Sequence, residues 1–84
     1  MPTFMDFHNE LKLSKEAIEK ITEMTAGKVV DQFGVRQIDL YHNEHGHVYC
    51  LLEAPSAEAV RLHHESMGVP CGNVHQVDSV AGFA

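Results

Sequence analysis

Asp6 and His8 are the first residues whose types and spacing could do chemistry. In an extended strand, alternate side chains share one face, so these two lie about 7 Å apart along it. A carboxylate and an imidazole at that separation can share a metal ion or a proton. The pair therefore indicates a metal site or an acid–base site. The alternative is two polar residues near a strand end.

His63 and His64 form the second group, on a predicted helix. The inward stripe of that helix includes Ala59, Val60 and His63, which directs His63 at the sheet and leaves His64 at the exposed edge of the stripe. A buried imidazole needs hydrogen-bond partners, because burying it unpaired costs about 1–3 kcal/mol. We expect His63 to approach the aspartate and histidine of the first strand. The alternative is a core histidine bonded to a backbone carbonyl.

Other reactive residues are less specific. The turn His42–His47 carries three histidines, which indicates weak binding of a divalent ion or simply a solvated polar turn, and His75 stands alone. Cys50 alternates onto a buried strand face, where an inert packing role is typical of a free cysteine. Cys71 lies in a Pro/Gly loop with nothing nearby to activate it. Glu53 ends a strand at the predicted mouth between helix and sheet, as a further ligand or a helix-start charge.

Composition limits the function. The 84 residues are 44% hydrophobic and 21% charged, with a net charge of −6, so nucleic acid and anionic membrane surfaces are not expected partners. The sequence lacks an apolar run of membrane-spanning length, a Gly-rich phosphate loop and a recognisable Ser/His/Asp order. We expect that residues 1–6 are not a signal peptide, because they lack a basic segment and a long apolar segment. Two cysteines are too few for a disulfide scaffold, which favours a reduced, cytoplasmic protein.

The elements that must position these residues follow from periodicity and caps. The order is β-α-β-β-α-β, which predicts an α+β, ferredoxin-like sandwich with both helices on one face of a four-stranded antiparallel sheet. We expect one domain over residues 1–78 and a loose tail over 79–84. The predicted strands cover 3–8, 35–41, 48–53 and 73–78, and the predicted helices cover 14–32 and 56–67.

Alternation along the second and third strands separates two faces. The uniformly apolar set, which fits beneath the helices, is Ile38, Leu40, Val48, Cys50 and Leu52. The opposite, mixed set is Val35, Gln37, Asp39, Tyr41, His47, Tyr49, Leu51 and Glu53. A solvated face rarely carries that much apolar area, so we expect a second copy to cover it and the protein to be a homodimer.

Several segments resemble a family of small ferredoxin-like proteins of unknown function whose characterised members are described as nickel-binding, with related domains beside nucleotide-cyclase domains. The resemblance covers residues 1–78. It rests on Phe4-Met5-Asp6-Phe7-His8, on Tyr41, on Val48-Tyr49-Cys50-Leu51-Leu52-Glu53-Ala54-Pro55-Ser56, and on His63-His64-Glu65-Ser66-Met67-Gly68.

The resemblance implies a homodimer with a divalent metal, possibly nickel, bound by histidine and carboxylate. Carried over by position, the ligands are Asp6, His8 and His63, and Tyr41 and Glu53 line the site. This sequence has methionine at position 67, where many relatives have histidine; a thioether is a softer ligand that suits Cu(I).

Three functions are compatible with these residues. The leading hypothesis is a small homodimeric metal-binding protein. The second is a small-molecule enzyme of monooxygenase or isomerase type, with Asp6, His8 and His63 as acid–base groups around a bound ligand. The third is a regulatory or interaction module. An enzyme needs an apolar pocket of roughly a few hundred Å³, whereas a metal site needs converging ligands and little space.

Overall fold

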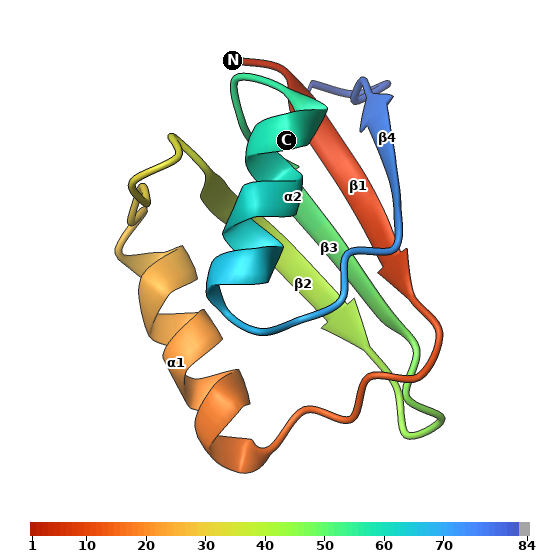
Figure 1. Cartoon of the computed structure of the whole chain (residues 1–84). Coiled ribbons are helices and arrows are strands. Elements are labelled where there is room, and N and C mark those ends of the chain that lie inside the picture. The colour runs from red at the N-terminus through yellow and green to blue at the C-terminus, as the bar shows by residue number, and fades with distance from the viewer. Residues whose placement is uncertain (83–84) are drawn as a thin grey trace.

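The computed structural model describes residues 1–82 and has the predicted ferredoxin-like α+β fold. Residues 83–84, which belong to the predicted tail, lie outside the described residues. Two helices lie on one side of a four-stranded antiparallel sheet of order β2-β3-β1-β4 (Figure 1). The elements are β1 (Thr3–His8), α1 (Lys15–Ala26), β2 (Arg36–His42), β3 (Val48–Glu53), α2 (Ala57–Ser66) and β4 (Asn73–Val77).

Both helices begin at the predicted serine caps. The Ser14 side chain accepts a hydrogen bond from the Ala17 backbone N–H at 3.1 Å, and Ser56 caps α2 in the same way. The prediction that the first helix continues to residue 32 is wrong. Gly27 ends it at the C-cap, and Lys28 follows with a φ of 52°, so the chain leaves the helix there.

β1 lies in the interior of the sheet, between β3 and β4. In the antiparallel register Asp6 lies opposite Cys50 on one side and opposite Val74 on the other. Phe4, Asp6 and His8 are buried and alternate with partly buried residues. The carboxylate and the imidazole of β1 therefore share the face that the helices cover.

A β-bulge at Ile38 changes the predicted faces of β2. The register shifts between Gln37 and Asp39, so Gln37 pairs with inward-facing Leu52 and Asp39 pairs with outward-facing Leu51. The Gln37 amide donates hydrogen bonds to the Asp39 and Leu51 carbonyls. The prediction that Val35 and Gln37 lie on the outer face is therefore wrong, since a strict alternation ignores the extra residue; Val35 is only 1% exposed.

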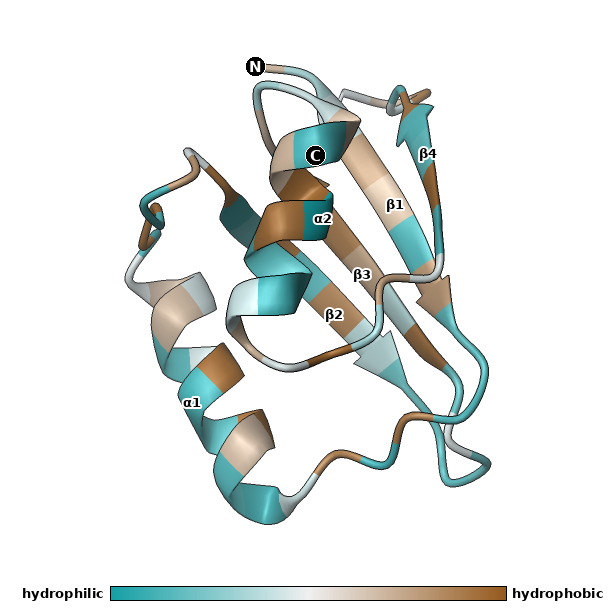
Figure 2. Cartoon of the chain, in the orientation of Figure 1, coloured by the Kyte–Doolittle hydropathy of each residue, from teal (hydrophilic) through white to brown (hydrophobic). Residues whose placement is uncertain are grey.

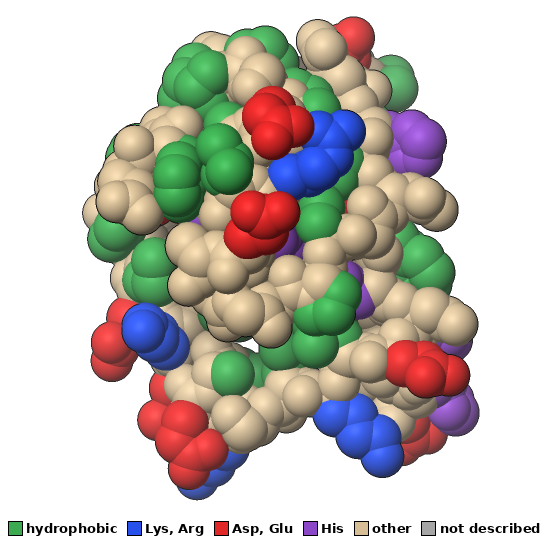
Figure 3. Space-filling view, viewed as in Figure 1, with side chains coloured by type: hydrophobic (Ala, Val, Ile, Leu, Met, Phe, Trp, Pro, Cys, Tyr) green, Lys and Arg blue, Asp and Glu red, His purple; other side chains and the backbone are tan. Residues whose placement is uncertain are grey.

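The core lies mainly between α2 and the sheet. It contains Phe4, Val35, Val48, Cys50, Leu52, Ala54, Ala59 and Val60. Figure 2 shows the hydrophobic positions of α1 on its side toward α2 and the sheet, yet none of the twelve residues of α1, all of which the structure describes, is buried. Packing between α1 and the sheet is thus incomplete, and hydrophobic side chains show in the hollow below α2 (Figure 3).

The loop from α2 into β4 approaches β1 very closely. A Cβ atom on Gly72 would lie 2.1 Å from the Phe7 carbonyl oxygen, so only glycine fits there. This contact sets the path of the loop past the end of β1, beside His8. Within residues 1–82, neither α1 nor α2 could span a lipid bilayer.

Candidate metal centre

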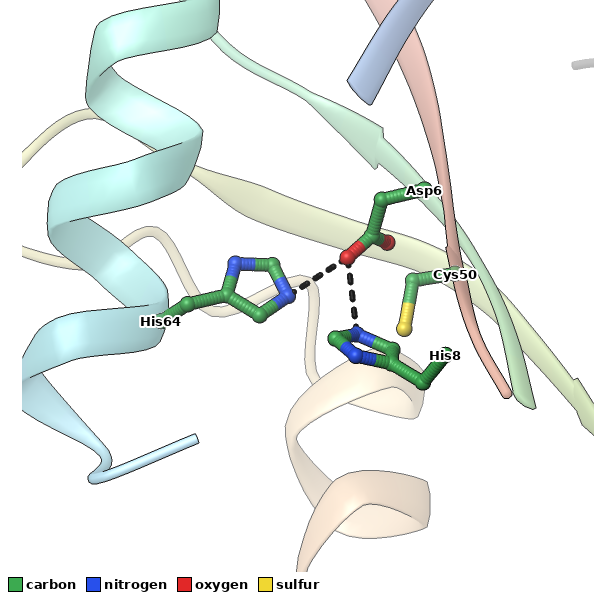
Figure 4. Close-up of side chains that lie close together, drawn as sticks. All are labelled: Asp6, His8, Cys50 and His64. Carbon is green, nitrogen blue, oxygen red and sulfur yellow. Dashed lines mark ion pairs between the residues drawn. The ribbon is translucent and has the colours of Figure 1, made fainter. Parts of the chain in front are cut away.

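Three elements bring four potential metal ligands together in the interior. Asp6 and His8 come from β1, Cys50 comes from β3 and His64 comes from α2 (Figure 4). One ligand atom from each residue lies within 4.8 Å of the other three, and all four residues are buried. We refer to these residues as the four-residue cluster.

Two imidazole nitrogens of the cluster face one carboxylate oxygen. His8 Nε2 and His64 Nε2 each lie 2.8 Å from Asp6 Oδ2 (Figure 4). These close contacts lack hydrogen-bond alignment. Among the described residues, both Asp6 oxygens and His8 Nε2 are buried polar atoms without a hydrogen-bond partner. Buried polar atoms normally have partners, so these orphaned atoms make the cluster a candidate cation site.

The backbone of α2 fixes the orientation of His64. Its Nδ1 lies 2.8 Å from the Val60 carbonyl oxygen, one helical turn earlier. A carbonyl can only accept, so Nδ1 carries the proton and Nε2 is the nitrogen that faces Asp6. Metal-binding histidines usually donate their second ring N–H in this way, which holds the ring in the ligating orientation.

Attraction between Asp6 and His64 favours the charged form of each side chain despite burial. Burial alone would raise the pKa of Asp6, but nearby His64 and His8 outweigh it and hold that pKa below its usual value. Burial opposes the charged form of His64, yet Asp6 and the Val60 carbonyl raise its pKa. Burial and the negative charge of Asp6 raise the pKa of the Cys50 thiol far above its ordinary range.

The donor set fits a divalent first-row transition metal. Imidazole suits nickel, copper and zinc, and thiolate and carboxylate complete mixed sites for these ions. Ligands about 2.0–2.3 Å from one ion lie roughly 4 Å apart or less. The spread of 4.8 Å in the cluster therefore requires only a small adjustment of side chains.

His64, which the sequence placed at the exposed edge of α2, is 2% exposed and belongs to the cluster, so that prediction is wrong. The structure does not bring His63 into the cluster. His63 is also buried, but its Nδ1 lies 2.5 Å from Asp31 Oδ2. Met67 is 51% exposed, at the end of α2.

Asp31 is a polar anchor that sequence reasoning missed. Its Oδ1 accepts hydrogen bonds from the backbone N–H groups of Phe33 and Val35, at 2.8 and 2.9 Å. Burial alone would raise the pKa of Asp31, but the bond to His63 and the two N–H groups lower it. The side chain thus ties the loop between α1 and β2 to α2. The short Asp-x-x-Gly turn at 31–34 is the signal that could have revealed it.

The other residues predicted to line the site lie elsewhere. Tyr41 is 55% exposed on the outer face of the sheet, where it pairs across the strands with Tyr49. Glu53 shares that face and lies 3.4 Å from Arg36. Among residues 1–82, the histidines of the turn 42–47 do not converge as a group of three ligands.

The chain is therefore a small α+β protein of ferredoxin-like fold with a candidate metal centre. Two imidazoles, a carboxylate and a thiol are buried together beneath its helices. A comparison with known protein families identifies the family of this chain. The chain belongs to the nickel responsive protein SCO4226-like family, whose model matches residues 4–77.

A solved structure is similar over nearly the whole chain. It is described as the crystal structure analysis of SCO4226 from Streptomyces coelicolor A3(2), with 28% sequence identity and a TM-score of 0.71. The match covers 92% of this chain and 96% of that one. A comparison with curated proteins finds no match.

Proposed function

We propose that this protein binds one divalent first-row metal ion, nickel foremost, at the four-residue cluster. The observation that carries the proposal is the convergence of His8 Nε2 and His64 Nε2 on one oxygen of Asp6 without hydrogen-bond alignment. Two ring nitrogens and a carboxylate can share a buried space when a cation lies among them. The nickel-responsive family description supports nickel as that ion.

Each member of the cluster has a distinct role in this proposal. His8 and His64 supply imidazole nitrogens, and Asp6 supplies a carboxylate oxygen that balances the charge of the ion. Cys50 supplies a sulfur after losing its proton, because a thiol that binds a metal does so as thiolate. His63 lies outside this ligand set, beside Asp31.

Native mass spectrometry with elemental analysis on untagged protein tests the proposal. We expect one nickel ion per chain after incubation with nickel. His64→Gln should lose it, and His75→Gln, on exposed β4, should retain it. Zinc and copper are offered in parallel, because intrinsic affinity alone ranks copper above nickel. Wild-type protein that stays free of every ion, or His64→Gln that still binds one ion per chain, would contradict the assignment.

The proposal includes a homodimer formed through the outer face of the sheet. Tyr41 and Tyr49 are 55% and 42% exposed there, and the Phe7 and Tyr49 rings pack 4.8 Å apart. Cross-strand aromatic pairs on an uncovered sheet face suit a second sheet packed against them. Tyr49→Asp should give monomers by light scattering, whereas Leu62→Asp on α2 should leave dimers. A wild-type monomer would contradict this part.

The proposed location is the cytoplasm. Cys50 is buried and Cys71 is partly buried, and both are free thiols. Free thiols are typical of a reducing compartment.

The size of the apolar cavity between α1, α2 and the sheet favours this function over an enzyme. This cavity, which His8, Cys50 and His64 help to line, is about 70 Å³, well below the roughly 300 Å³ at which pockets for organic substrates begin. The cluster itself has converging ligands and little room. These are the properties that distinguish a metal site from a substrate pocket.

A further inference from the structure

An open cleft lies at the end of β1, where the loop from α2 into β4 passes beside that strand (Figure 1). Its volume is about 560 Å³, and its wall comes from residues 7–11 on one side and residues 70–73 on the other. The wall includes the carboxylate of Glu10, the amides of Asn9 and Asn73 and the thiol of Cys71. The cleft therefore offers oxygen and sulfur donors on the surface of the protein.

His8 connects this cleft to the four-residue cluster, because it belongs to both. It is 7% exposed, and its Nε2 lies 2.8 Å from Asp6 Oδ2. This nitrogen has no hydrogen-bond partner among residues 1–82. A buried ring nitrogen without a partner is available to an ion. The inner end of the cleft is therefore already a potential ligand of the cluster.

The loop contact at Gly72 holds Cys71 beside the end of β1. A Cβ atom at position 72 would lie 2.1 Å from the Phe7 carbonyl oxygen, so the neighbouring Cys71 lies close to that strand as well. Cys71 is a free, partly buried thiol. Burial, and then the negative charge of Asp6, raise the pKa of this thiol. The thiol is therefore within electrostatic reach of the cluster.

The charges around this thiol favour a cation. The carboxylates of Asp6 and Glu65 act on it, and Glu10 belongs to the same cleft wall. The positive group that acts on it is Arg61, which is paired with Glu58 at 2.8 Å. A surplus of negative charge raises the local concentration of cations and speeds their association.

The apolar cavity between the helices and the sheet is a poor path for an ion. It also reaches the cluster, but its volume is only about 70 Å³ and hydrophobic side chains make most of its wall. Six waters around an ion fill about 180 Å³, and their loss to an apolar wall is costly. The cleft has room for the hydrated ion, and its donors can replace the waters in turn.

We propose that the cleft is the path by which a divalent metal ion enters and leaves the four-residue cluster, and that Cys71 is the first ligand on this path. The Cys71 sulfur binds the ion as thiolate and releases its proton to water. The thiol takes a proton from water again when the ion moves on past His8. This inference rests on the proposed function, because the cluster is where the path ends.

The kinetics of metal loading test the path. We would mix untagged protein with nickel by stopped flow, follow the thiolate-to-nickel absorption, and measure release by adding a strong chelator. Cys71→Ser should slow association and dissociation by the same factor, about tenfold, so the dissociation constant stays unchanged. A residue on the path affects both directions equally, whereas a ligand of the final site changes the dissociation constant.

Two matched controls define the path further. Met67 is also a sulfur residue, but it lines the apolar cavity, so Met67→Leu should load at the wild-type rate. Glu10→Lys should slow loading several-fold at low salt, whereas Glu44→Lys, the same charge change on the β2–β3 turn, should not. If Cys71→Ser does not fold, wild-type protein alkylated at Cys71 takes its place.

Each unfavourable result has a distinct meaning. Wild-type loading rates after substitution or alkylation of Cys71 would overturn the entry path and leave the metal centre standing. Equal slowing by Met67→Leu would also overturn it, because the ion would then pass the apolar cavity. A raised dissociation constant in Cys71→Ser would make Cys71 a ligand of the final site instead. Wild-type protein that binds no ion would contradict the proposed function, and the path with it.

Discussion

Exchanging one of the two adjacent histidines of α2 at a time gives the sharpest test of the metal centre. His64 Nε2 lies 2.8 Å from Asp6 Oδ2, whereas His63 Nδ1 lies beside Asp31. We would replace each by glutamine, which is similar in length and keeps a hydrogen-bonding end. His64→Gln should lose most of the stabilisation by nickel, and His63→Gln should keep most of it.

The size of the effect follows from binding to the folded state alone. Nickel at a hundred times its dissociation constant stabilises the folded state by about 2.7 kcal/mol. For a domain of 60–100 residues, each kcal/mol moves the Tm by about 4–8 °C, so the wild-type protein should gain roughly 10–20 °C. Loss of even a supporting partner costs up to about a hundredfold in metal affinity, and loss of a ligand costs at least as much. His64→Gln should therefore gain only about 2–3 °C at the same nickel concentration.

Thermal unfolding by circular dichroism, with and without nickel, measures both variants. Each variant is compared with its own metal-free form, so any change in intrinsic stability cancels. A full nickel shift in His64→Gln together with none in His63→Gln would refute the ligand set. It would place His63 at the metal instead, as the family resemblance alone implies. Equal shifts in both variants would place the metal away from α2.

Three further outcomes are expected. Gly72→Ala should destabilise the protein by about 1–3 kcal/mol in urea unfolding, because the new Cβ would lie 2.1 Å from the Phe7 oxygen; an unchanged midpoint would contradict that close approach. The folded-state pKa of Asp31 lies below 3.8, so its stabilisation is complete near neutral pH and is lost as the pH falls through 3.8 toward that lower value. Asp31→Asn should thus be less stable than wild type at pH 7, and the difference should shrink as the pH falls below 3.8 in the metal-free state; parallel curves would refute this. Cys71 should react with iodoacetamide before Cys50 by mass spectrometry, because Cys50 is the more buried and its thiol pKa is strongly raised; the reverse order would contradict this burial.

Much of the fold could be predicted because its signals are local. Alternation in β1 places Asp6 and His8 on one face, and alternation in β3 places Cys50 inward. The caps Ser14 and Ser56 begin both helices by bonds within the same turn. Each of these features depends on residues close in sequence, which periodicity and side-chain chemistry describe well.

The site could be predicted only in part, because its geometry depends on contacts between distant segments. The residue pattern of α2 alone cannot show whether His63 or His64 contacts β1, because the position of α2 over the sheet determines which imidazole lies there. Asp31, 32 residues before His63, pairs with His63 and leaves His64 toward Asp6. The bulge at Ile38 likewise leaves no clear mark in an alternating pattern.

The antiparallel register that sets Asp6 opposite Cys50 has a consequence for the newly made chain. The first two donors are at positions 6 and 8, the sulfur is at position 50 and the last imidazole is at position 64. An emerging chain therefore carries the Asp-x-His pair long before the third and fourth donors leave the ribosome. Two donors on one strand hold an ion weakly, so under the proposed function incomplete chains would not sequester scarce metal. Loading would belong to the finished fold, and the ion would then join β1 to α2.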